Sequence, residues 1–182
     1  MTRKILFIQG GGDGGYEADK ALVKPLQKNL GSEYVINYPE LQTDESLPDF
    51  GWMQQIDQKV LESKDNTILV AHSLGASMLL KYLSENSIAK KIDGIFLIST
   101  LFWSGSEDWK TGLKLQDNFA DKLPNEVQLF FYHCVDDEVA PFSHFDHYKQ
   151  KLTGATFREI ESGGHQLNND LTIVAKDIKS LR

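Results

Sequence analysis

The 182-residue sequence contains a single cysteine, Cys134, and no long hydrophobic run. One cysteine cannot form an internal disulfide, which excludes a disulfide-stabilised secreted domain and favours a reducing compartment. No uninterrupted apolar run exceeds four residues, whereas a membrane-spanning helix needs about 20, so we expect no membrane partner. The first strand-like run begins at Lys4, which leaves no room for a signal peptide. We therefore predict a cytoplasmic protein.

Positive charge is also scarce. The chain has 19 Lys and Arg residues against 26 Asp and Glu residues, a formal net charge of −7. A nucleic-acid-binding surface needs a basic stripe, so we expect no nucleic-acid partner. The 41% share of hydrophobic residues excludes general disorder. Because domains commonly have about 100–200 residues, residues 1–182 are expected to form one domain. These features leave the oligomeric state open.

Short apolar, β-rich segments recur along the chain and predict six strands: Lys4–Gln9, Tyr34–Tyr38, Thr67–Ala71, Ile92–Ser99, Val127–Cys134 and Ala155–Ile160. Several are continuously apolar, as expected for strands buried on both faces of a sheet. Helical patterns lie between them, and the clearest predicts one helix from Leu167 to Leu181. This alternation predicts an α/β fold, a three-layer αβα sandwich around a mostly parallel sheet.

The strongest local motif is Ala71-His72-Ser73-Leu74-Gly75, which directly follows one predicted strand and directly precedes a predicted helix. A nucleophile elbow occurs in this strand–turn–helix context and exposes a serine hydroxyl at a tight turn. Small residues are needed two positions before and after that serine, where strand and helix crowd together. Helix capping by Ser73 is the alternative interpretation. The position after a buried strand favours Ser73 as a nucleophile.

A nucleophilic serine needs a histidine base and an acid that orients the base. On an α/β-hydrolase sheet these residues follow in the chain order Ser, acid, His. Two acids, Asp136 and Asp137, follow the fifth predicted strand, and we choose Asp136 because it stands three positions before Val139. The predicted base is His165, where two preceding glycines let the loop bend back over the sheet edge.

An oxyanion hole requires two backbone N–H donors near the nucleophile. One donor is predicted to be the N–H of Leu74, the residue after the nucleophile. The other should come from the glycine-rich loop after the first strand, where Gly11 is our choice and Gly12 the alternative. Gln9 occupies the place where such loops usually have histidine, a departure that leaves the backbone donors intact.

The chain resembles the α/β-hydrolase superfamily in four segments taken together: ILFIQGGG, VAHSLGA, VDDEVAP and SGGH. More narrowly, the chain resembles the compact serine hydrolases related to retinoblastoma-binding protein nine and their small bacterial relatives. The resemblance implies a six-stranded parallel sheet with chain order 2-1-3-4-5-6, no large cap, and neither a metal nor an organic cofactor. The resemblance indicates a catalytic mechanism more specifically than it indicates a substrate.

Two long connections, Pro39–Asp49 and Thr100–Pro124, follow predicted strands and should lie at the carboxyl edge of the sheet. Aromatic residues in and beside them are expected to wall a substrate pocket, with Trp103 the first choice, followed by Tyr38 and Trp109. Without a cap, the pocket should be shallow and favour short acyl groups.

The predicted function is hydrolysis of a small carboxylic ester or related acyl compound through an acyl-enzyme on Ser73. Two alternatives remain open: a hydrolase scaffold retained as an interaction protein, and a dinucleotide-binding protein that uses the pattern Gly10-x-Gly12-x-x-Gly15. The dinucleotide interpretation expects an acid for the ribose at the end of the second strand, but the second predicted strand ends Ile36-Asn37-Tyr38.

Overall fold

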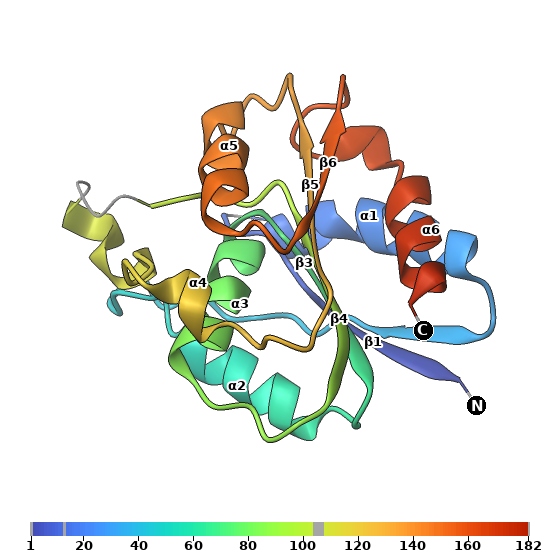
Figure 1. The fold of residues 1–182 in the computed structure, drawn as a ribbon, viewed down its shortest axis with the longest axis horizontal. Helices are drawn as coiled ribbons and strands as arrows, with labels where there is room; N and C mark the ends of the chain where they lie inside the picture. Colours follow the sequence, from blue (N-terminus) through green and yellow to red (C-terminus); the bar gives the residue numbers. More distant parts are fainter. Residues whose placement is uncertain (1, 13, 104–107, 182) are drawn as a thin grey trace.

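The computed structural model describes residues 2–12, 14–103 and 108–181, with only the backbone of 108–110 (Figure 1). Its strands are β1 (Arg3–Ile8), β2 (Tyr34–Asn37), β3 (Thr67–His72), β4 (Ile92–Ile98), β5 (Leu129–Cys134) and β6 (Thr156–Ile160). They form one sheet of order β2-β1-β3-β4-β5-β6, and every neighbouring pair is parallel. The predicted fold class and strand order are therefore confirmed.

Helices connect the strands and form the two outer layers. The α-helices are α1 (Gly15–Leu30), α2 (Trp52–Glu62), α3 (Ser73–Glu85), α4 (Phe119–Lys122), α5 (Phe142–Lys151) and α6 (Thr172–Ser180), and the short helical turns are η1 (Asp108–Leu113) and η2 (Leu167–Asn169). In Figure 1, α1 and α6 lie on one side of the sheet, and α2, α3, α4 and α5 lie on the other. Among the described residues, no helix is long and apolar enough to cross a membrane.

Alternation along the strands divides the core into two parts, one on each face of the sheet. In β1, Leu6 and Ile8 belong to the core beneath α2 and α3, whereas Ile5 and Phe7 belong to the core beneath α1 and α6. All four side chains are at most 1% exposed. Complete burial of such a side chain stabilises the fold by roughly 1.5–3 kcal/mol. The continuous apolar runs of the sequence thus reflect burial on both faces.

The C-terminal helix is shorter than predicted. Leu167, Asn168 and Asn169 have φ angles of 50°, 49° and 57°, so the chain makes a left-handed turn before α6 begins at Thr172. Asparagine tolerates this conformation better than most residues. Asp170 then accepts a hydrogen bond from the Thr172 N–H at 2.9 Å, which helps to start α6. The turn brings the loop after β6 back over the end of the sheet.

Candidate active site

Ser73 lies at a sharp turn between β3 and α3. Its φ angle of 53° is in the left-handed region, which is unfavourable for a residue other than glycine. The strand ends at His72 and the helix starts at Ser73 itself, so the turn contains no spare residue. Gly75 is required by packing, because a Cβ atom there would lie 2.0 Å from the carbonyl oxygen of Gln9. This local geometry is that of a nucleophile elbow.

His165 stands over Ser73 from the loop that follows β6. Its Nε2 atom is 2.8 Å from the Ser73 hydroxyl oxygen. Both residues are largely buried, with exposed fractions of 9% and 6%. Gly163 and Gly164 precede the histidine with φ angles of 150° and 61°, and the second value is one that glycine adopts without strain. The structure therefore brings the predicted nucleophile and the predicted base into hydrogen-bonding contact.

The acid that faces His165 is Asp137, which corrects our choice of Asp136. The His165 Nδ1–H donates to the two carboxylate oxygens of Asp137 at 3.0 Å each. Asp137 also accepts the backbone N–H groups of Val139 at 2.9 Å and Ala140 at 2.8 Å. These bonds turn its side chain inward, whereas the side chain of Asp136 stays exposed. The spacing to Val139 could not reveal this difference between two adjacent acids.

Three consecutive acids after β5 hold different parts of the histidine loop. Asp136 accepts the N–H groups of Gly163 and Gly164, each at 2.9 Å. Glu138 accepts the N–H of His165 at 3.2 Å, and Asp137 accepts the proton on its ring. The acidic run thus fixes both the backbone and the side chain of His165.

The hydrogen bonds define how His165 is protonated in this arrangement. A carboxylate only accepts hydrogen bonds, so the ring proton lies on Nδ1, and Nε2 presents its lone pair to the Ser73 hydroxyl. Burial by itself opposes ionisation of Asp137, but hydrogen bonds from His165, Ala140 and Val139 outweigh it and lower the pKa to about 2. Asp137 is therefore a carboxylate at neutral pH. The arrangement can activate a serine hydroxyl for attack on a carbonyl carbon.

The glycine-rich loop after β1 borders the serine. The N–H of Gly10 donates to the Asp19 carboxylate at 2.7 Å and is therefore already engaged. Gly11 packs on the residue after the nucleophile: a Cβ atom at Gly11 would lie 2.5 Å from Cδ2 of Leu74. Gly11, Gly12 and Leu74 all line the cavity that contains Ser73. Gln9 contributes differently, because its side-chain oxygen accepts the Leu41 N–H at 2.8 Å and ties down the chain after β2.

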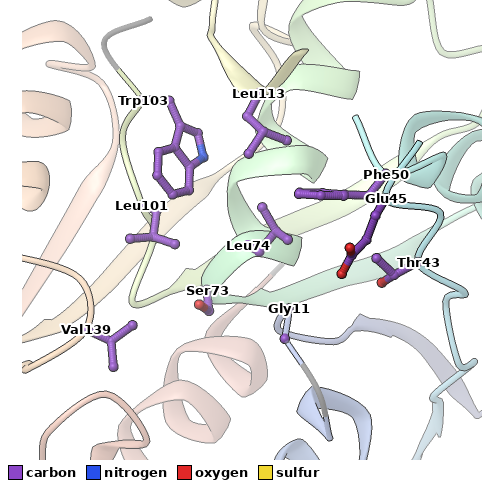
Figure 2. A pocket seen from close by; sticks show the side chains of 11 residues that line it. Gly11, Thr43, Glu45, Phe50, Ser73, Leu74, Leu101, Trp103, Leu113 and Val139 are labelled. Atoms are coloured by element: carbon purple, nitrogen blue, oxygen red, sulfur yellow. The ribbon is translucent and has the colours of Figure 1, made fainter. Parts of the chain in front are cut away.

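A cavity of about 560 Å³ opens above Ser73 (Figure 2). Trp103, Leu101 and Val139 lie on one side of it, and Phe50, Glu45 and Thr43 lie on the other. The two long connections pack against each other at Gly112, where a Cβ atom would lie 2.1 Å from the carbonyl oxygen of Pro48. Five of the eleven described lining residues belong to the two long connections: Thr43, Glu45, Leu101, Trp103 and Leu113.

The three aromatic residues chosen from the sequence have different positions. Trp103 lies in the wall of the cavity. Tyr38 does not line it, because its ring stacks on Tyr16 at a centroid distance of 4.5 Å and its hydroxyl donates to the Tyr16 carbonyl at 2.7 Å. The side chain of Trp109 lies outside the described part of the chain. Phe50, which lies just beyond the first long connection, also lines the cavity. No signal in the sequence indicated three further lining residues, Leu101, Leu113 and Val139.

Three further histidines, His133, His144 and His147, make contacts away from Ser73. The Nε2–H of His133 donates to the Ala140 carbonyl at 2.8 Å, and burial lowers its pKa. His144 accepts the Phe102 N–H at 3.1 Å, and His147 packs on the Phe102 ring at 3.8 Å between centroids. Within the described residues, no three His, Cys, Asp or Glu side chains are placed to hold a metal ion.

Residues 24–171 match the serine hydrolase family, and the chain belongs to that family. The all-parallel sheet and the elbow give it the compact form of the α/β-hydrolase fold. Family membership agrees with the position of Ser73 at the elbow and makes the chain a serine hydrolase in class.

Similar proteins include YdeN of Bacillus subtilis strain 168, which is 26% identical and aligns with 93% of this chain and 89% of its own length. Its crystal structure superposes with a TM-score of 0.73 at 22% identity, covering 98% of both chains. SOBER1 of Arabidopsis thaliana has a TM-score of 0.67 at 18% identity, again covering 98% of both chains. A lipase-esterase related protein of Clostridium acetobutylicum ATCC 824 has a TM-score of 0.67 at 13% identity, covering 99% of this chain and 94% of its own. The structural likenesses show a shared fold.

Proposed function

We propose that the protein hydrolyses small carboxylic esters through an acyl-enzyme formed on Ser73. The observation that carries this proposal is the continuous contact from the Ser73 hydroxyl to Nε2 of His165, and from Nδ1 of His165 to Asp137. Acyl transfer requires a serine hydroxyl that is hydrogen-bonded to an imidazole, and an imidazole that in turn donates a hydrogen bond to a buried carboxylate.

The reaction begins when the Ser73 oxygen attacks the ester carbonyl carbon and Nε2 of His165 takes the hydroxyl proton. The carbonyl oxygen becomes an oxyanion, for which the N–H groups of Leu74 and Gly11 are the proposed donors. Asp137 stabilises the imidazolium that forms. The intermediate then collapses, the C–O bond to the alcohol breaks, and His165 returns its proton to the leaving oxygen. Water attacks the acyl-enzyme by the same route and releases the acid.

The cavity supports a short, uncharged acyl group as the preferred substrate. Most of its described lining is apolar, and its one charged residue is the acid Glu45. An anionic acyl group would be repelled by this carboxylate, although exposed charges are screened beyond about 8 Å at physiological salt. A lipase-esterase related protein among the structural neighbours is consistent with ester chemistry. A small acyl compound is therefore the expected partner.

A serine-directed fluorophosphonate probe provides the direct test, because labelling requires an activated hydroxyl. We expect the wild-type protein to be labelled and Ser73→Ala to stay unlabelled. Turnover of p-nitrophenyl esters of graded chain length then separates an esterase from an interaction protein that retains the scaffold. A wild-type protein that neither takes the label nor cleaves any ester would contradict the proposal.

The proposal places this activity in the cytoplasm, on the ground that the single cysteine is a buried free thiol. Such a thiol suits a compartment where thiols stay reduced. Localisation of a tagged protein by cell fractionation tests this assignment, and recovery in an extracellular fraction would contradict it.

A further inference from the structure

A second buried histidine–carboxylate pair lies directly behind the Ser73–His165 contact. Nδ1 of His72 is 2.9 Å from one carboxylate oxygen of Asp19 and 3.0 Å from the other. Nε2 of His72 is 3.0 Å from the backbone carbonyl oxygen of His165. Both side chains are almost completely buried, with exposed fractions of 2% and 1%. The mechanism above assigns no role to either residue.

The contacts determine where the protons of this pair lie. The carbonyl oxygen of His165 can only accept, so Nε2 of His72 carries a hydrogen. Asp19 is fully supplied with donors, since its oxygens also accept the Gly10 N–H at 2.7 Å and the Gln166 side-chain N–H at 3.1 Å. Burial opposes ionisation of Asp19, yet its pKa is lowered, chiefly by the hydrogen bond and charge of His72. Nδ1 of His72 faces this carboxylate, so both ring nitrogens of His72 lie against acceptor oxygens.

The pair connects the three segments that the proposed reaction uses: the glycine-rich loop after β1, the elbow at Ser73 and the loop that carries His165. Asp19 binds Gly10, which precedes the proposed oxyanion donor Gly11. His72 precedes Ser73 in the elbow, and it reaches the loop of the base through the His165 carbonyl. That carbonyl also accepts the buried Ser99 hydroxyl at 2.9 Å. The ring of His165 also faces His72, at 4.8 Å between centroids.

We propose that Asp19 and His72 form a positioning pair, in which His72 holds the His165 backbone so that the His165 ring stays within reach of Ser73. The inference rests on the proposed function for its kinetic consequence, but the protonation of His72 does not depend on it. Neither residue contacts the reacting atoms. Their effect is on the fraction of molecules in which base and nucleophile are aligned, and therefore on kcat rather than on substrate binding.

His72→Asn separates positioning from simple structural support. The shorter amide can still donate to Asp19 near the place of Nδ1, but it cannot reach the His165 carbonyl. We expect kcat for a p-nitrophenyl ester to fall about 10- to 100-fold while KM changes by less than about twofold, as for loss of an interaction that orients a catalytic group. Asp19→Asn should show the same division between kcat and KM. Glu17→Gln, an exposed acid-to-amide change on the same helix, is the matched control and should leave both constants unchanged.

Nitrogen-15 NMR of histidine-labelled wild-type protein reports directly which ring nitrogens of His72 carry hydrogen. Because it uses the wild-type protein, the result does not depend on whether His72→Asn folds. We expect Nε2 of His72 to show the shift and proton coupling of an N–H group that donates to the His165 carbonyl. A His72 whose Nε2 carries no hydrogen, or a His72→Asn protein that folds and keeps wild-type kcat, would overturn the proposal. Wild-type labelling by the fluorophosphonate probe is measured in parallel. Its absence would count against the proposed hydrolysis, while the NMR result would still decide the protonation of His72.

Discussion

Replacement of Asp137 by asparagine tests the central contact of the site, because it changes the protonation of His165 without changing the shape of the acid. One carboxylate oxygen of Asp137 accepts two backbone N–H groups, from Val139 and Ala140. Only the amide oxygen of an asparagine can take that place. The amide nitrogen must then occupy the other position, next to Nδ1 of His165.

An amide N–H beside Nδ1 favours the other tautomer of His165, in which the proton sits on Nε2 and faces Ser73. That imidazole cannot accept the serine proton. We therefore expect kcat to fall by a factor on the order of 10³ to 10⁴, the size of effect seen when the wrong histidine tautomer is stabilised.

Asp136→Asn is the matched comparison. The Asp136 oxygen that accepts both Gly163 and Gly164 can be replaced by an amide oxygen with little change in geometry. Only the longer contact to Gly163, at 3.2 Å, is lost. We expect kcat to stay within about threefold of wild type, with a cost in stability of about 1 kcal/mol.

The assay compares kcat and KM of both variants on one short p-nitrophenyl ester, with circular dichroism to verify folding. Fluorophosphonate labelling rates provide a second measure of serine activation. If Asp136→Asn lost as much activity as Asp137→Asn, or if Asp137→Asn retained a tenth of wild-type kcat, the assignment of the acid from geometry would be refuted.

Three further predictions concern the pKa of Asp137, the cavity wall and the packing at the elbow. The pKa of Asp137, about 2 against an ordinary value near 3.9, stabilises the native state by roughly 2–3 kcal/mol above about pH 4, and this contribution disappears as the pH falls toward 2. Urea unfolding should therefore show a steeper loss of stability in this window for wild type than for Asp137→Asn, and equal losses would contradict the prediction. Trp103→Ala should shift the ranking of ester chain lengths, because this side chain lies in the cavity wall; an unchanged ranking on the graded panel would remove Trp103 from the pocket. Gly75→Ala should lose at least about 1–3 kcal/mol in urea unfolding through the clash with Gln9, whereas Gly154→Ala, with no atom within 4 Å of its added Cβ, should unfold as wild type does.

The sequence by itself determined the fold class and the positions of Ser73 and His165. These features depend on short-range patterns. A continuous apolar run indicates a strand buried on both faces, and Ala71-His72-Ser73-Leu74-Gly75 directly after such a run predicts the elbow, because only small residues fit where strand and helix meet. The glycines before His165 likewise predict a loop that can bend back.

Only the tertiary structure decided which acid faces the base and which residues wall the cavity. Asp136 and Asp137 are adjacent in sequence, but their side chains point in different directions. Asp136 binds Gly163, 27 positions further along the chain, and Asp137 binds His165, 28 positions further along. The ring of Tyr38 stacks on Tyr16 and does not line the cavity. Asp19 contacts His72, which lies 53 positions away in the sequence. Side-chain direction in a turn is set by such distant partners, because a turn lacks the fixed alternation that a strand or helix imposes.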